Sequence, residues 1–360
     1  MKEKMPISSL HDDVYVPKST GHLGEYKNYP ERFDPKEKSV ITRMEQFGVD
    51  INDVENTFGK KAVDLTEKEY NLIMAEVIKG QYDTIVASVF DQYMFPSPES
   101  PDDTVRKEKM FKLIQQFENM DAKCGVNLIR RKKDFKEKGN LVLGLEAGAH
   151  LIKTVADAKE LTEQGIKIFG LQYGKENTLV DKDGALTELG QDTVRYFLDN
   201  NLIIDLAHTG FKARQEVMGI AEERKKGNLI SYTHGALMDD LIDSWKGKVG
   251  ENRLLNLEEV RSIIKMGGII GLGVTKPFFD NTRKVAERID SIAQLDRGID
   301  HLAIGTDFGG VAPEWLNEIK SAKDFHILGE ILSRNFGMRD EDIKKIIRSN
   351  AKNWIKNAID

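Results

Sequence analysis

Eight short apolar runs, separated by longer charged segments, constrain the fold of this chain more than any other feature. Several runs are nearly continuous in β-branched and aliphatic residues, which is typical of parallel strands covered on both faces. The predicted strands are residues 7–10, 84–90, 141–145, 167–171, 202–206, 229–232, 268–274 and 301–304. Helical spacing of apolar residues predicts helices between them over residues 155–164, 187–200, 211–226, 256–266 and 280–297.

This alternation favours an α/β fold, a closed (β/α)8 TIM barrel, over an open doubly wound sheet. A dinucleotide-binding sheet would need a G-x-G-x-x-G turn after an early strand, and none is present there. The 360 residues suffice for one such barrel. We therefore predict a single barrel domain over residues 1–360, in which residues 14–80 form an elaborated insertion of loop and helices.

Charge and cysteine content exclude several classes of protein. The formal net charge of −6 does not suggest the basic surface that nucleic-acid binding requires. The single cysteine excludes a disulfide within the chain and a thiolate metal cluster. No run approaches the roughly 18 apolar residues of a membrane span, and the N-terminal residues lack the apolar region of a signal peptide. The sequence thus favours a cytoplasmic protein that binds a small-molecule substrate and no membrane.

Imidazole and carboxylate side chains follow five of the predicted strands. In a barrel, the carboxyl ends of the strands form the pocket in which catalytic residues collect. Nitrogen and oxygen donors without sulfur suit Zn²⁺ or a similar divalent ion in a catalytic site. The residues at these positions are His11, Asp13, Glu146, His208, His234 and Asp307.

The spacing of these residues suits a pair of metal ions. His11 and Asp13 stand two apart on an extended segment, so both side chains point to the same face. The two oxygens of Glu146 could bridge two ions. Ions about 3.5–4 Å apart lower the pKa of a shared water and polarise a carbonyl. Asp307 could then act as a ligand, as the base that takes the proton of the water, or as both.

The order of these motifs resembles the membrane (renal) dipeptidase family of zinc peptidases, which have amidohydrolase-type barrels. The family's His-x-Asp, Gly-x-Glu, Ile-Asp-Leu-Ser-His, Ser-His and Gly-x-Asp-Phe motifs are similar to five segments of this chain. The corresponding residues are 11–13, 144–148, 204–208, 233–234 and 305–311. Two further segments, 184–190 and 349–354, resemble the family's Gly-Leu-Thr stretch and its closing helix.

The resemblance implies one metal held by His11 and Asp13, a second held by His208 and His234, and Glu146 as the bridge. It also implies a homodimer. Zn²⁺ is the metal that it favours at both positions, and the implied reaction is hydrolysis of the amide bond of dipeptides.

The resemblance assigns two further residues and also shows departures from the family, which include Ala149-His150, where the family's histidine would fall one residue earlier. It places Asp307 near the first metal, where it manages the proton of the attacking water, and it makes Arg253 the best match for the arginine that holds the substrate carboxylate. After the fourth strand the family has Thr-His, and its histidine stabilises the oxyanion. This chain has Gln172-Tyr173 there, and a tyrosine hydroxyl could donate a similar hydrogen bond. Gly309 stands where the family usually has aspartate.

Three other functions stay open at this point. The same barrel and metals could act on N-acyl amino acids, other small amides or lactones, which the Gln172-Tyr173 departure favours somewhat. A non-catalytic barrel could use the same side chains to bind a ligand. A metal-dependent nuclease ranks last, because it would usually carry His-x-His after the first strand and a phosphate-tracking basic surface.

Overall fold

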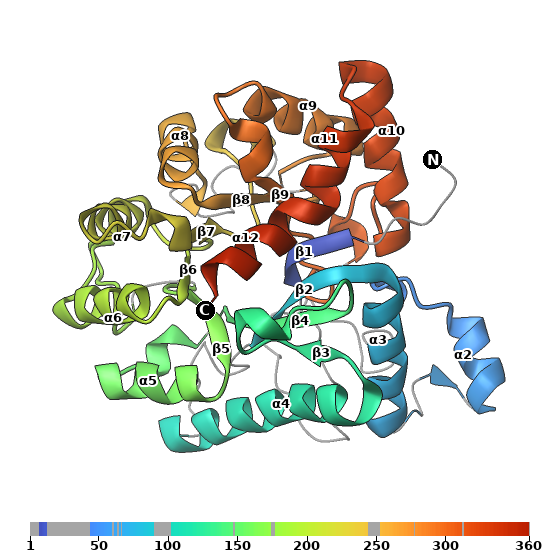
Figure 1. Ribbon diagram of the computed structural model, residues 1–360, viewed down its shortest axis with the longest axis horizontal. Helices are drawn as coiled ribbons and strands as arrows, with labels where there is room; N and C mark the ends of the chain where they lie inside the picture. The colour runs from blue at the N-terminus through green and yellow to red at the C-terminus, as the bar shows by residue number, and fades with distance from the viewer. Residues whose placement is uncertain are drawn as a thin grey trace.

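Eight parallel strands form a closed barrel in the computed structural model of this chain (Figure 1). The structure describes residues 7–12, 44–59, 61–62, 65, 67–89, 102–146, 148–173, 177–243, 253–276, 278–311 and 313–359, with the backbone alone for residues 7–12 and 67–68. Around the ring the strands follow the order β2-β1-β9-β8-β7-β6-β5-β4, and the pairing of β2 with β4 closes it. The predicted (β/α)8 barrel is therefore confirmed.

The strand bounds lie within two residues of the predicted ones. They are β1 Ile7–Asp12, β2 Tyr82–Val89, β4 Asn140–Leu145, β5 Ile166–Gly170, β6 Ile203–Asp205, β7 Ile230–Tyr232, β8 Ile269–Leu272 and β9 Leu302–Ile304. A two-residue strand, β3 Asn127–Leu128, adds to the start of β4. Every residue of β2 and of β4 is buried, as expected of strands covered on both faces.

Helices cover the outside of the barrel (Figure 1). Their bounds are α2 Ile51–Phe58, α3 Glu67–Gln81, α4 Asp103–Cys124, α5 Val155–Glu163, α6 Glu188–Asp199, α7 Phe211–Glu223, α8 Leu257–Met266, α9 Thr282–Ala293, α10 Phe325–Phe336, α11 Asp340–Lys344 and α12 Asn350–Ala358. A single π-helical turn, Lys345–Ser349, joins α11 to α12. None of the helices in the described ranges is both long and apolar enough to span a membrane.

Local sequence signals explain where the helices after β5 and β7 begin. Thr187 starts α6, and its hydroxyl accepts a hydrogen bond from the Gly190 amide at 2.9 Å. Asn256 and Glu259 form a capping box at the start of α8, and Gly267, with a φ of 85°, ends that helix. These caps fix the residues at which the loops after β5 and β7 end and the helices begin.

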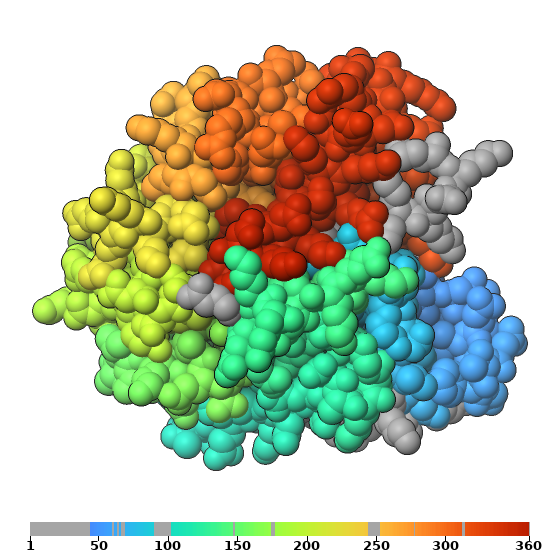
Figure 2. Space-filling model, in the orientation of Figure 1, coloured from blue at the N-terminus to red at the C-terminus, as the bar shows by residue number. Residues whose placement is uncertain are grey.

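The C-terminal helix closes the amino end of the barrel. The Trp354 indole donates a hydrogen bond to the Gly267 carbonyl, just before β8, at 3.1 Å. The Asn350 amide donates to the carbonyls of Ile299 and Leu302, before and at the start of β9, at 2.8 Å each. Figure 2 shows this segment covering the middle of the molecule in that view. The carboxyl ends of the strands therefore open on the opposite side.

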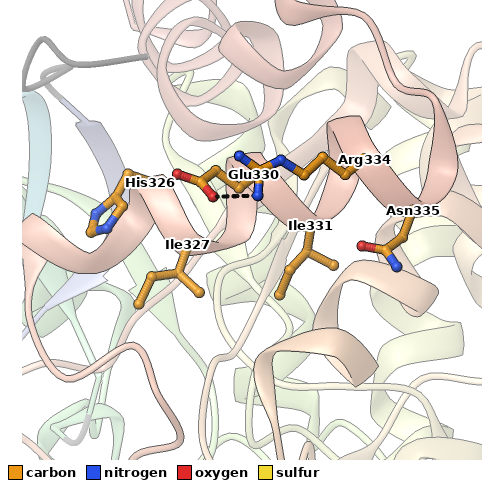
Figure 3. A pocket seen from close by; sticks show the side chains of 6 residues that line it. All are labelled: His326, Ile327, Glu330, Ile331, Arg334 and Asn335. Atoms are coloured by element: carbon orange, nitrogen blue, oxygen red, sulfur yellow. Dashed lines mark ion pairs between the residues drawn. The ribbon is translucent and has the colours of Figure 1, made fainter.

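The outer face of α10 is a solvated surface. Figure 3 shows Glu330 and Arg334 one helical turn apart. Their side chains form an ion pair with an N–O distance of 3.3 Å. Both side chains are exposed, and an exposed ion pair of this kind contributes little to stability. We assign no functional role to this face.

The predicted insertion is described only in part. Residues 13–43, 60, 63–64 and 66 lie outside the described ranges, whereas α2 and α3 fall within the predicted 14–80 segment. Helix α3 leads directly into β2, as the crossover helix of the first β/α unit. The prediction of one domain with an insertion at this place stays a prediction.

Candidate metal centre

Three side chains from different strands converge at the carboxyl end of the barrel. Glu146 directly follows β4, His208 lies three residues beyond β6, and His234 lies two residues beyond β7. The two histidine Nε2 atoms are 2.8 Å apart, and the Oε1 atom of Glu146 lies 3.2 Å from His208 Nε2 and 3.8 Å from His234 Nε2. Of the predicted ligands, these three are therefore brought together.

The geometry of this trio fits a divalent cation. Ligand atoms about 2.05 Å from a tetrahedral Zn²⁺ stand about 3.3 Å from one another. The three separations here run from 2.8 to 3.8 Å and so bracket that value. Glu146 and His234 are both 8% exposed, so their polar atoms need a partner inside the protein. A shared positive ion would satisfy all three.

A buried hydrogen-bond chain orients His234. The Asp205 carboxylate accepts the Thr233 hydroxyl at 2.6 Å and the Thr233 amide at 2.9 Å. The Thr233 oxygen has thus donated its own proton, so at 3.0 Å it accepts from Nδ1 of His234. This leaves the lone pair of His234 on Nε2, which faces Glu146. Such partners behind a histidine ligand fix its tautomer and its ring orientation.

The second oxygen of Glu146 is also held. The Ser88 hydroxyl, near the end of β2, donates to Oε2 of Glu146 at 3.2 Å. Below the trio lies a small cavity inside the barrel, which is lined in part by Ser88, Glu146, Asp205 and Thr233. The barrel interior immediately below the site thus carries polar as well as apolar side chains.

Two predicted site residues have a strained backbone. His208 has a φ of 61° and Asp307 has a φ of 57°. Left-handed conformations cost residues other than glycine about 1 kcal/mol or more and cluster at functional sites. The other such residues, Asn201, Lys225 and Arg297, lie at turns beyond helices, where this conformation is common. The strain at His208 and Asp307 instead occurs on loops after β6 and β9.

The loop that carries Asp307 is fixed by close contacts. A Cβ atom added to Gly305 would lie 1.9 Å from the Thr233 carbonyl oxygen and 2.9 Å from the His234 Cβ. The end of β9 is therefore packed tightly against the segment that carries His234. Further along the loop, the side chain of Gln46 accepts from the Gly309 amide at 2.7 Å and donates to the Val311 carbonyl at 3.0 Å. Asp307 itself is half-buried.

Gln172 and Tyr173, which depart from the family pattern, both contact the loop of His208. The Gln172 side chain accepts from the Gly210 amide at 2.9 Å, and the ring centroid of Tyr173 lies 4.5 Å from that of His208. Burial lowers the pKa of Arg253, and the electrostatic interaction with Tyr173 raises it. Tyr173 thus packs against His208 and interacts electrostatically with Arg253.

The two ligands predicted for the first metal cannot be placed as side chains. The backbone of His11 lies in β1, between β2 and β9. Its side chain and all of Asp13 lie outside the described residues. The proposed first metal position is therefore untested, and His11 and Asp13 stay predictions.

Sequence reasoning missed the residues behind the ligands. Asp205 and Thr233 fall within motifs that it singled out, but it gave them no role, and it did not mention Ser88. Their shared signal is a polar residue inside a buried strand or directly after one, in a position that apolar residues usually fill.

The comparisons with known proteins match one part of the chain to a family and the chain's fold to solved structures. The sequence model of the membrane dipeptidase family (peptidase family M19) matches residues 244–358, which include Arg253 and Asp307. The resemblance predicted from the motifs is confirmed over that segment. The three converging side chains lie upstream of it.

Solved structures share the barrel over nearly the whole chain. A metallopeptidase described as dipeptidase AC has a TM-score of 0.68 and 14% identity, covering 99% of both chains. A metallopeptidase from Rhodobacter sphaeroides, with a phosphinate mimic of the dipeptide L-Ala-D-Ala bound, has a TM-score of 0.66 and 13% identity, covering 98% of this chain and 99% of that one. An amidohydrolase from Pseudomonas aeruginosa has a TM-score of 0.60 and 18% identity, covering 78% and 90%. At such identities the likeness shows the fold.

Proposed function

From the family match and the convergence of Glu146, His208 and His234, we propose that this chain is a metal-dependent hydrolase that cleaves the amide bond of dipeptides. The convergence is the observation that carries the proposal, because three neutral or anionic donors meet within ligand distance at the catalytic end of the barrel. The match to the membrane dipeptidase family supports the hydrolase class and the dipeptide as substrate.

We propose two divalent ions, and the nitrogen and oxygen ligands favour Zn²⁺. When bound, such ions supply positive charge that lowers the pKa of a water and polarises the amide carbonyl. His208 and His234 would hold one ion, His11 and Asp13 would hold the other, and Glu146 would be shared between them. The ends of the strands fix the relative positions of these ligands.

The remaining site residues act on the substrate. Asp307 accepts the proton of the attacking water and passes it towards the leaving amine. Arg253 binds the carboxylate of the dipeptide through its guanidinium group. Tyr173, which packs against His208, donates its hydroxyl hydrogen to the carbonyl oxygen as negative charge develops there.

The position of Tyr173 also favours a second substrate class. A tyrosine where the family has histidine changes the donor that faces the carbonyl, so N-acyl amino acids, other small amides or lactones are the alternative substrates. Both classes use the same metals and the same proton transfer. A ligand-binding barrel without catalysis is the third possibility, and it predicts that Asp307→Asn leaves function unchanged.

The test is a substrate panel on purified, zinc-loaded protein. Dipeptides, N-acyl amino acids and lactones are compared at equal concentration, with metal content measured in parallel. We expect about two zinc ions per chain and dipeptide turnover that Glu146→Gln and Asp307→Asn abolish. Glu160→Gln, an exposed carboxylate on α5, serves as the control that keeps wild-type activity. A protein that binds zinc but turns over no dipeptide would contradict the first substrate class.

The cytoplasmic location and the homodimer stay predictions that rest on the sequence and on the resemblance. Size-exclusion chromatography with light scattering decides the oligomeric state. Fractionation of the source cells decides the location.

A further inference from the structure

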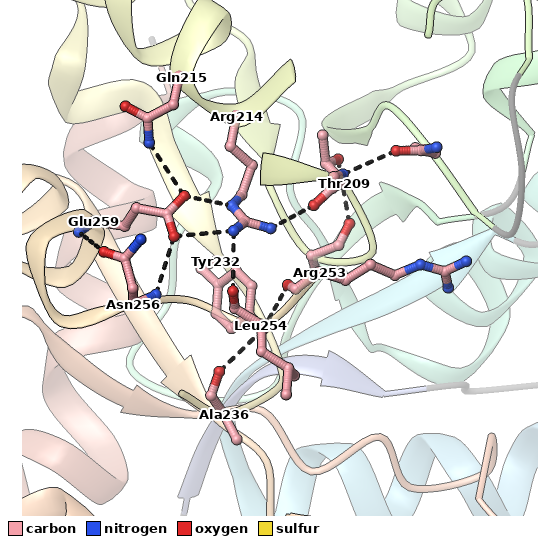
Figure 4. Close-up of polar contacts among 12 residues, drawn as sticks. Thr209, Arg214, Gln215, Tyr232, Ala236, Arg253, Leu254, Asn256 and Glu259 are labelled. Carbon is pink, nitrogen blue, oxygen red and sulfur yellow. Dashed lines mark hydrogen bonds and ion pairs between the residues drawn. The ribbon is translucent and has the colours of Figure 1, made fainter. Parts of the chain in front are cut away.

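A buried ion pair joins the two helices that follow the histidine-bearing strands. Arg214 on α7 is 1% exposed and Glu259 on α8 is 2% exposed. The Arg214 Nε atom donates to Oε1 of Glu259 at 2.7 Å, and its Nη2 atom donates to Oε2 at 2.9 Å, so the contact is bidentate (Figure 4). Among the fully buried side chains of the described residues, Arg214 is the largest.

The same guanidinium group also binds two main-chain carbonyls. Its Nη1 atom donates to the Thr209 carbonyl at 2.6 Å, and its Nη2 atom donates to the Leu254 carbonyl at 3.0 Å. Thr209 directly follows His208, and Leu254 directly follows Arg253. Each carbonyl thus belongs to the residue after a proposed site residue, and the one guanidinium group of Arg214 contacts both.

Further contacts fix this pair in place. Glu259 accepts from the Asn256 amide at 3.0 Å in the capping box of α8, and the Gln215 side chain donates to it at 3.3 Å. The buried Tyr232 hydroxyl lies 3.3 Å from the Arg253 carbonyl, and burial raises the pKa of Tyr232, so this group stays a donor. The main chain is therefore held at two successive carbonyls, those of Arg253 and Leu254, and all of these groups are shown in Figure 4.

We propose that Arg214 and Glu259 are positioning residues that set the metal-binding loop at His208 and the substrate-binding loop at Arg253 at a fixed distance. Burying two charges is costly, and apolar residues of similar volume usually stabilise a core as well. A planar five-donor group is needed only where several acceptors must be held at once. The carbonyls of Thr209 and Leu254, which follow His208 and Arg253, are such acceptors.

This inference rests on the proposed function for the role of Arg253, but its first readout, metal affinity, does not depend on catalysis. Arg214→Lys keeps the charge beside Glu259 and loses the planar fork. The double variant Arg214→Met with Glu259→Met removes both charges together, so no buried charge is left unpaired. Arg348→Lys is the matched control, because Arg348 pairs with the buried Asp83 at the opposite end of the barrel.

Zn²⁺ affinity is measured by competition with a chromophoric chelator, and unfolding is measured by urea denaturation. We expect both Arg214 variants to bind Zn²⁺ about tenfold more weakly, as for the loss of groups that orient ligands. Arg348→Lys should keep wild-type affinity. If dipeptides are hydrolysed, KM should also rise in the Arg214 variants, with a smaller change in kcat, because Arg253 has moved.

Wild-type Zn²⁺ affinity in the folded double variant would overturn the proposal, even if that variant were less stable. An equal loss of affinity in Arg348→Lys would also overturn it, since the effect would then be general. If the wild-type protein hydrolyses no dipeptide, the proposed function fails, while the affinity comparison still decides whether Arg214 positions the His208 loop.

Discussion

Replacing Thr233 by valine removes one hydroxyl from the chain that orients His234 and keeps the shape of the side chain. Thr233 is 1% exposed and Asp205 is 5% exposed, so water cannot replace the lost contacts easily. The hydroxyl donates to Asp205 at 2.6 Å and accepts from His234 Nδ1 at 3.0 Å. A hydrogen bond to a charged group contributes about 1.5–3 kcal/mol and a neutral one about 0.5–1.5 kcal/mol. We therefore expect Thr233→Val to lower the free energy of unfolding by about 2–4 kcal/mol.

The same substitution frees the ring of His234 to rotate and to change tautomer. Loss of a partner behind a metal ligand weakens metal binding by about 10–100-fold. The assays are urea denaturation of the metal-free protein and Zn²⁺ competition with a chelator. Thr233→Ser is the control, because it keeps the oxygen and should retain Zn²⁺ affinity within a few-fold. If Thr233→Val binds Zn²⁺ as tightly as the serine variant, the hydroxyl does not orient His234.

Three further predictions concern packing, pH and metal removal. Gly305→Ala should abolish Zn²⁺ binding without replacing any ligand, because its Cβ would lie 1.9 Å from the Thr233 carbonyl oxygen; unchanged binding would contradict the close approach of β9. For Asp157, burial raises the pKa, but hydrogen bonds from Lys107, Thr154 and the backbone outweigh it and lower the pKa to about 2. Asp157→Asn should therefore destabilise the protein at pH 5–7. The difference in unfolding free energy between the wild type and this variant should narrow as the pH falls from about 4 towards 2. A difference that does not change with pH would refute this. Stripping metal with EDTA should lower Tm, and added Zn²⁺ should restore it in the wild type but not in His234→Ala, since only the native state holds the site.

The sequence predicts the strands of this fold well because each strand is a dense apolar run. Such runs are buried on one face by the barrel interior and on the other by the surrounding helices. It predicts the helices less completely. Helix α4, 22 residues long, was not predicted, although its buried residues Met110, Ile114 and Phe117 recur at helical spacing. The charged residues between them weaken the average apolar signal of the segment. The two-residue strand β3 was also missed, because two residues show no periodicity.

Prediction of the candidate site succeeds where barrel geometry alone suffices. Parallel strands of a closed barrel end on one rim, so ligands at strand ends must face each other, as Glu146, His208 and His234 do. The groups that aim those ligands depend on packing between loops. The pairing of Arg214 with Glu259, 45 positions apart, has no local signature in the sequence. The left-handed backbone of His208 is likewise invisible without the loop around it.

The closure of the barrel has a consequence for the order of folding. Strand β1 is the first in the chain, yet it pairs with β9, where Ser9 stands opposite Ile304. The bonds from Gln46 to Gly309 and Val311 also join positions more than 260 residues apart. Contacts of such high sequence separation form late, because the entropy of closing the intervening loop must be lost first. We therefore expect Zn²⁺-binding competence to appear in the slowest refolding phase, after most of the helical circular dichroism signal has returned.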